Sequence, residues 1–134
     1  MNGTPEKTFG KQSYYSMVSE GSNSNINKRE VRIITSGEEL QEIFAKINST
    51  RKPGIEIPDV DWKKQTVIAA FLGKKSTAGY GLQIVQVQDN EERRVYKFSE
   101  TAPSSGEDVV SMVITSPYMI VIVENDEKKI TASF

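Results

Sequence analysis

The chain has 134 residues, and its 17 lysines and arginines against 18 aspartates and glutamates give a formal net charge of -1. This length predicts one domain with its own buried core, and the balanced charge gives no reason to expect nucleic acid as a partner. The chain contains no cysteine and no histidine. Disulfides, thiol nucleophiles, imidazole general bases and zinc sites built on nitrogen or sulfur are therefore excluded.

The N-terminal third is predicted to hold an arm and two strands. Residues 1–11 offer little that a core would bury, so we expect a flexible arm, followed by a single domain over residues 12–134. Residues 13–19 are rich in aromatic and apolar side chains and predict a first strand. Residues 28–35 alternate between apolar and charged side chains, which is typical of a half-buried strand.

A helix is predicted over residues 36–48. Ser36 and Glu39 have the S-x-x-E spacing of a capping box, in which each side chain satisfies an unpaired backbone amide at the helix start. The apolar residues that follow fall at i, i+3, i+4 and i+7, which places them on a single face. They are Leu40, Ile43, Phe44 and Ile47.

The segment after the helix is predicted to be extended. Residues 51–61 contain two prolines, which cannot donate to a β-ladder, so we expect a connection or an edge strand. Trp62, the single tryptophan, follows it and is expected to anchor the core or a lid.

The rest of the chain predicts a series of strands. Residues 66–72 are apolar on both faces, which is typical of a central strand covered on both sides. In residues 81–88 the apolar alternation changes phase, which indicates a bulge. Further strands are expected over residues 95–98, 109–115, 118–123 and 130–134.

Together these elements predict an α+β fold, a mostly antiparallel, curled or barrel-like β-sheet with one packed α-helix. Basic doublets such as Lys74-Lys75 and Arg93-Arg94 adjoin apolar runs, where they are expected to solubilise turns and strand ends. The predicted core is Leu40, Ile43, Phe44, Ile47, Ile68, Phe71, Leu72, Ile84, Val121 and Phe134.

The sequence predicts no catalytic, cofactor or metal site. Asp59 and Asp61 are two residues apart, but the segment lacks the further oxygen ligands of a calcium loop, so a solvated turn is expected. Lys75 and Ser76 are neighbours in sequence, and on an extended chain neighbouring side chains point apart. A Ser–Lys catalytic pair is therefore not expected, and the chain is not predicted to be an enzyme.

Two loops, residues 74–81 and 115–118, each bring a hydroxyl residue, a turn residue and a tyrosine to the start of a strand. One interpretation is structural: glycine permits a positive φ, proline fixes φ, and each tyrosine packs its ring. The alternative is an interaction patch, formed if both loops lie at one end of the domain. Its candidate residues are Lys75, Thr77, Gly79, Tyr80, Thr115, Pro117 and Tyr118.

The order of these motifs resembles the PrcB family, the C-terminal domain of a protease complex subunit. Residues 67–73 resemble its V-I-A-x-F-x-G strand, residues 77–80 its T-G-G-Y loop, residues 100–103 its E-x-x-P stretch and residues 115–118 its T-x-P-Y turn. Ala78 replaces the first glycine of the T-G-G-Y loop, so no positive φ is expected at that position.

The resemblance implies a non-catalytic domain of the cell envelope, periplasmic or extracellular, that assembles or stabilises a surface protease complex. It implies a secreted or surface protease as the partner, and membrane attachment only through a lipid anchor outside this chain. The sequence leaves the oligomeric state open. Two alternatives also remain: a carbohydrate- or peptide-binding module that uses Trp62 and the tyrosines, and a protease-inhibitor-like domain presenting the Thr77–Tyr80 loop, which weakly resembles chagasin-like cysteine-protease inhibitors.

Overall fold

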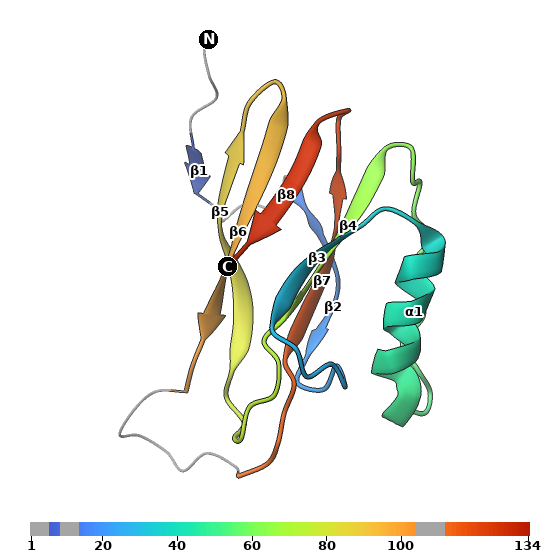
Figure 1. The fold of residues 1–134 in the computed structure, drawn as a ribbon, viewed down its shortest axis with the longest axis vertical. Coiled ribbons are helices and arrows are strands. Elements are labelled where there is room, and N and C mark those ends of the chain that lie inside the picture. Colours follow the sequence, from blue (N-terminus) through green and yellow to red (C-terminus); the bar gives the residue numbers. More distant parts are fainter. Residues whose placement is uncertain (1–5, 9–13, 104–111) are drawn as a thin grey trace.

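A computed structural model of the chain describes residues 6–8, 14–103 and 112–134. Strands in this part of the chain form two stacked four-stranded sheets, and the helix α1 covers the outer face of one of them (Figure 1). Sheet A has the order β1-β5-β6-β8, and sheet B has the order β2-β7-β4-β3. The strands are β1 (Glu6–Thr8), β2 (Ser16–Gly21), β3 (Glu30–Ile34), β4 (Gln65–Phe71), β5 (Gly81–Asp89), β6 (Arg93–Thr101), β7 (Tyr118–Glu124) and β8 (Lys129–Ser133), and the helices are α1 (Gly37–Ile47) and the short 3₁₀ helix η2 (Asn48–Thr50).

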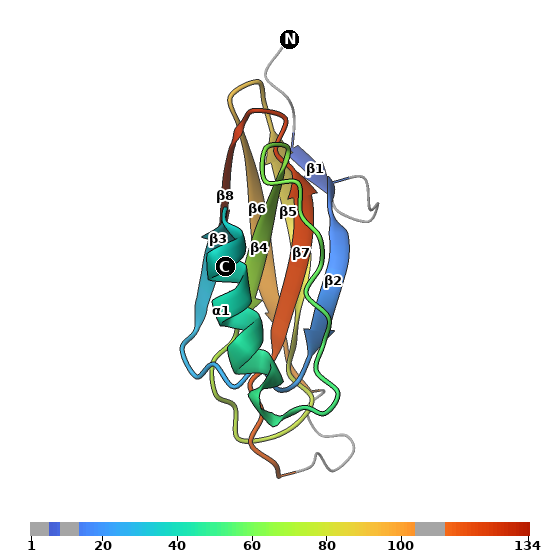
Figure 2. The ribbon, with the colours of Figure 1, turned by 90° about the vertical axis from the view of Figure 1, so that its right-hand side faces the viewer.

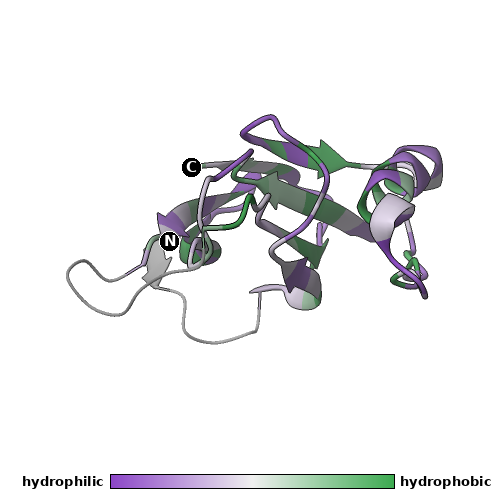
Figure 3. Ribbon diagram, turned by 90° about the horizontal axis from the view of Figure 1, so that it is seen from below, coloured by the Kyte–Doolittle hydropathy of each residue, from purple (hydrophilic) through white to green (hydrophobic). Residues whose placement is uncertain are grey.

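The predicted helix is confirmed. Ser36 caps its start, with the Ser36 hydroxyl accepting a hydrogen bond from the Glu39 amide at 3.3 Å. The carboxylate of Glu39 accepts instead from Arg32 on β3 at 2.8 Å, so this side chain ties the helix to sheet B. All four residues of the apolar stripe are buried against sheet B, each contributing about 1.5–3 kcal/mol. In Figure 2 the helix lies in front of β3 and β4, and in Figure 3 its ribbon is part hydrophilic and part hydrophobic.

Strand β4 is the predicted central strand. It pairs antiparallel with β3 on one side and with β7 on the other. Because successive side chains of a strand point to opposite faces, β4 contributes to both cores. Val67, Ala69 and Phe71 pack with the helix, whereas Ile68 and Ala70 pack between the two sheets.

The phase change in β5 is the predicted bulge. The pairing of β5 with β6 shifts register between Ile84 and Gln86, which leaves Val85 unpaired and 37% exposed. Ile84 and Val87, on either side of the shift, are both buried between the sheets. The bulge thus lets both halves of β5 face the same core.

The sheets are mostly antiparallel, as predicted, but the expectation of a single curled or barrel-like sheet is wrong. Asp126 and Glu127, both at positive φ, make the tight turn after β7. Beyond this turn β8 does not pair with β7; it pairs parallel with β6 in the other sheet. The C-terminal strand therefore joins the two layers of a sandwich.

Several local predictions need correction. Phe134 is only partly buried, beneath Arg29 at 4.1 Å, rather than a core residue; the other nine predicted core residues are buried. Residues 6–8, in the predicted arm, form β1 and pair with β5; the rest of that arm lies outside the described residues. Of the predicted strand 109–115, residues 109–111 also lie outside them, and residues 112–114 are not assigned to a strand.

Residues 51–61 run as an extended connection without strand pairing. Trp62, at the end of this connection, is half-buried and packs against the helix-side core, which confirms it as an anchor. In the described part of the chain, no helix combines the length and the apolar character that crossing a bilayer requires.

Candidate interaction site

The two predicted loops meet at one end of the sandwich, where β4 ends and β5 and β7 begin. The Lys75 amide donates to the Thr115 carbonyl at 2.8 Å, and the Thr115 amide donates back to the Lys75 carbonyl at 2.9 Å. The Thr115 hydroxyl also donates to the Thr77 carbonyl at 3.1 Å. Backbone pairing thus holds Lys75, Thr77 and Thr115 together at this end.

Glycine is required at two positions, one immediately before the first loop and one within it. Gly73 has a φ of +80°, and a Cβ at this position would lie 3.1 Å from the Arg29 amide nitrogen and the Asn27 carbonyl oxygen. Gly79 has a φ of +100° and is exposed. Ala78 is not among the described residues with positive φ, as expected from its replacement of a glycine. The loop therefore turns at Gly73 and Gly79.

The second loop is mostly internal, which corrects the predicted patch. Tyr118 is 2% exposed and packs in the helix-side core, and its hydroxyl lies 2.7 Å from that of Ser19. Thr115 and Pro117 are buried as well. These three residues support the loop from inside and are not available on the surface to a partner.

Tyr80 and Lys75 belong to a row of charged side chains and aromatic rings that contact one another across the same end of the sandwich. The Lys75 ammonium lies 4.6 Å from the centre of the Tyr80 ring and 2.9 Å from the Glu100 carboxylate. The other oxygen of Glu100 accepts from Arg29 at 2.6 Å, and Arg29 covers Phe134. The hydrogen bond from Lys75, helped by Arg29 and opposed by partial burial, holds the pKa of Glu100 below its ordinary value.

Sequence reasoning missed the most exposed part of this end. Met112, Val113 and Ile114 are 81%, 48% and 65% exposed, and they lead directly into Thr115. Lys74 is exposed and makes no ion pair with any described residue. The signal is a run of three consecutive apolar residues, which the sequence pattern predicts to be part of a strand over residues 109–115.

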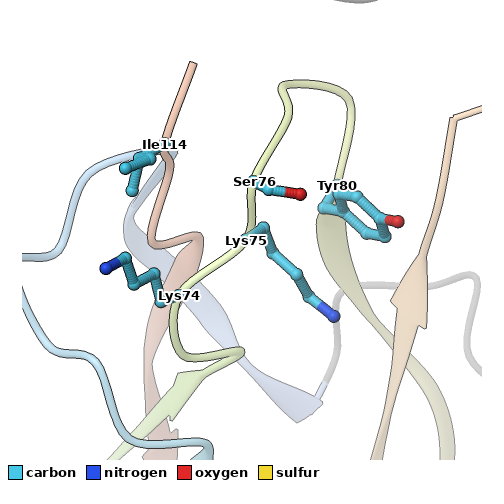
Figure 4. A pocket seen from close by; sticks show the side chains of 5 residues that line it. All are labelled: Lys74, Lys75, Ser76, Tyr80 and Ile114. Carbon is cyan, nitrogen blue, oxygen red and sulfur yellow. The ribbon is translucent and has the colours of Figure 1, made fainter. Parts of the chain in front are cut away.

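An open pocket of about 390 Å³ lies between these parts (Figure 4). Figure 4 shows Lys74 beside Ile114, and Lys75 on the other side of the chain, toward Tyr80. We call this end of the sandwich the Lys75 end. Its outer surface is formed by the exposed residues Lys74 and Met112–Ile114 and by the partly exposed Tyr80, which the Lys75 ammonium contacts. The pocket is lined by Lys74, Lys75, Ser76, Tyr80 and Ile114.

The opposite end of the sandwich carries a buried charge cluster, which we call the Arg94 end. The Arg94 side chain is 5% exposed and donates to Asp89 at 3.1 Å, to Asp126 at 2.8 Å and to the Glu124 carbonyl at 2.7 Å. Lys128 donates to the same oxygen of Asp89 at 2.8 Å. Here the structure differs from the expected solvated doublet: Arg93 is exposed, but Arg94 is buried.

The charged groups of the Arg94 end hold one another ionised. Burial opposes ionisation of Asp89, but hydrogen bonds from Lys128 and Arg94 outweigh it, and the pKa of Asp89 is below its ordinary value. Burial likewise opposes the charge of Arg94, yet Asp126 and Asp89 raise its pKa. Burial also raises the pKa of Tyr96 to about 12, and the Tyr96 hydroxyl donates to the Tyr14 carbonyl at 2.6 Å. The buried polar groups of the Arg94 end are thus hydrogen-bonded to one another or to the backbone.

The described residues contain no group of acidic side chains that could hold a metal ion. Among known protein families, the model described as PrcB C-terminal matches residues 66–124. Residues 66–124 are thus similar to the C-terminal domain of the PrcB family. The matched region runs from β4 through β7, so it includes both loops of the Lys75 end. Neither a curated protein nor a solved structure matches the chain.

Proposed function

We propose that this PrcB-like chain is a non-catalytic interaction module of the cell envelope that helps to assemble or stabilise a surface protease complex. The family match over residues 66–124 supports the assignment to PrcB-like proteins. The observation that carries an interaction role is the exposed apolar run Met112–Ile114 beside Lys74 and Tyr80.

The exposure of this run is unfavourable unless something covers it. Elsewhere in the described chain, large exposed apolar side chains occur singly, such as Met17, Ile57 and Val85. Each of these is about 40% exposed, which is less than any residue of the run Met112–Ile114. A contiguous apolar patch with a polar rim is typical of a protein-binding surface. Full burial of one such side chain contributes about 1.5–3 kcal/mol, so covering the run would supply much of the affinity for a partner.

The arrangement at this end also supports a role without catalysis. Lys75 is paired with Glu100, so its ammonium is not a free base for the neighbouring Ser76. The Lys74 side chain points away from Ser76 (Figure 4). Ser76 thus has no amine positioned to activate it, and we expect the purified protein to show no turnover of peptide or ester substrates.

Pull-down with the purified chain tests the proposal. The chain, crosslinked in envelope extracts of its source cells, should retain a protease that mass spectrometry identifies. Ile114→Asp should reduce this retention at least about tenfold, because it places an uncompensated charge where an apolar contact is needed. Ile57→Asp is the matched control, since Ile57 is also an exposed isoleucine but lies on the extended connection before Trp62.

Equal retention by the two variants, or recovery of no protease by the unmodified chain, would contradict the proposal. Both variants should keep the circular dichroism spectrum of the parent chain, because both replaced side chains are exposed. If no protease is retained and oligosaccharides change the fluorescence of Trp62, a carbohydrate-binding role is favoured instead.

A further inference from the structure

Strand β7 loses its neighbours abruptly at the Lys75 end. Along its length it is paired with β2 on one side and β4 on the other. Backbone pairing continues through the three residues before the strand. The Pro117 carbonyl accepts from the Leu72 amide, Ser116 bonds to the backbone of Ser22 and Ser24 on the other side, and Thr115 exchanges hydrogen bonds with Lys75. The chain is therefore fixed in position up to Thr115.

Immediately before Thr115, the backbone has no such partners. Met112, Val113 and Ile114 make no backbone hydrogen bond to any described residue, although the chain continues in line with β7 (Figure 1). Valine and isoleucine favour strands, because branched side chains fit a pleated surface, and the sequence pattern also predicts a strand here. This short segment is suited to a β-ladder but has no partner strand in the described part of the chain.

The charge beside the segment indicates what kind of strand it would accept. Lys74 lies on the same side as Ile114 (Figure 4) and is not neutralised by a described residue, unlike Lys75, which is paired with Glu100. A second copy of this chain would bring a second Lys74 to the same surface, and like charges that face each other across a ladder are destabilising. A partner segment with carboxylates is favoured instead.

We propose, on the basis of the function proposed above, that an extended acidic segment of the partner adds to Met112–Ile114 as a β-strand. Its backbone would pair with the amides and carbonyls of these residues, which bond to no described residue, its apolar side chains would cover Ile114, and a carboxylate would lie beside Lys74. In this mode of recognition, main-chain hydrogen bonds provide affinity and alternate side chains provide specificity.

Three short synthetic peptides test the mode of binding by fluorescence anisotropy. The first alternates valine with glutamate, the second has lysine in place of glutamate, and the third is the first with its alternate backbone amides methylated. The first should bind, the second about fivefold or more weakly because its charges oppose Lys74, and the third at least about tenfold more weakly because it cannot donate to the ladder.

Lys74→Glu should reverse the preference between the glutamate and lysine peptides. Lys63→Glu is its control, because Lys63 is also exposed but precedes β4, whereas Lys74 follows it at the opposite end of the strand. Hydrogen exchange should show that amides of residues 112–114 become protected when the first peptide binds.

Equal binding of the methylated and unmethylated peptides, or no binding of any peptide, would overturn strand addition. The proposed function would survive either result if Ile114→Asp still abolished retention of the protease, since the partner would then use a folded surface. If the unmodified chain also retained no protease, both the proposed function and strand addition would be contradicted.

Discussion

Strand β6 carries charged side chains at its two ends under opposite conditions. Near its start, Arg94 is 4% exposed and bound to two carboxylates and a carbonyl. Near its end, Glu100 is partly exposed and pairs with Lys75 and Arg29, while the adjacent Lys74 makes no ion pair with a described residue. Burial accounts for the difference: a buried charge is tolerated only when its hydrogen bonds are satisfied, while an exposed one can remain available to a ligand.

The buried ion pairs and the proposed binding surface thus lie at different ends of the same sandwich. The Arg94 end fixes the turn after β7 through Asp126 and so directs β8 into sheet A. At the Lys75 end, the interior is packed around Tyr118, and only the outer layer is left exposed. Substitutions should therefore affect folding or binding according to depth and position, and the following predictions test that separation.

The largest loss is expected inside the Lys75 end. Tyr118→Ala should lower the free energy of unfolding by about 3–5 kcal/mol, because it leaves a cavity in the helix-side core. Tyr80→Ala, the matched substitution of a partly exposed tyrosine, should cost less than about 1 kcal/mol. Urea denaturation measures both values. Similar losses for the two tyrosines would mean that the outer layer of this end is structural as well, and the proposed binding surface would lose its support.

A smaller loss is expected at the Arg94 end. Arg94→Met should lower the free energy of unfolding by about 3 kcal/mol, because it keeps much of the side-chain volume but removes the donor to the Glu124 carbonyl and leaves Asp89 with Lys128 as its remaining cation. Lys75→Met, at the other end, should cost less than about 1 kcal/mol, since its ion pair with Glu100 is partly exposed. If the two substitutions cost the same in thermal or urea unfolding, the ends do not differ as described.

The smallest effect is expected on how the free energy of unfolding changes at acidic pH. The pKa of Asp89 is lowered in the folded protein, so the stability it contributes is fully present above its ordinary pKa of about 4 and is lost as the pH falls through the lower folded value. Asp89→Asn should therefore flatten the decline of unfolding free energy below about pH 4. Glu100→Gln should change this slope in the same direction but less, because solvent screens its partners. A larger effect at Glu100 would reverse the comparison between the ends.

The sequence predicted the local elements well where one pattern decides the structure. The helix, the central strand β4 and the bulge at Val85 each follow from the spacing of apolar residues, which any packed core requires. The pairing of strands did not follow. Nothing in residues 125–128 indicates that β8 would pass β7 and pair with β6, because pairing depends on contacts between distant segments.

The candidate site was predicted only in part. One of the two interpretations of the loops required them to lie at one end of the domain, and the hydrogen bonds between Lys75 and Thr115 bring them together there. The depth of each side chain could not be predicted, since Tyr80 and Tyr118 both follow a turn and precede a strand. Similarly, the doublets at Lys74-Lys75 and Arg93-Arg94 look alike, and only the folded chain shows that the second cation of each has ion pairs whereas the first has none with a described residue.

The order of strands in sheet B has a consequence for how the chain reaches its folded state. Ser16, near the beginning, pairs with Ile122, near the end, and β4 also needs β7 as its neighbour. Such non-local pairing is slow to form, because closing the long intervening loop costs conformational entropy before the paired strands can stabilise each other. During synthesis, the apolar β4 would leave the ribosome well before β7 exists to cover it. We expect the nascent chain to depend on a chaperone in that interval, because its apolar central strand is then unpaired and aggregation-prone.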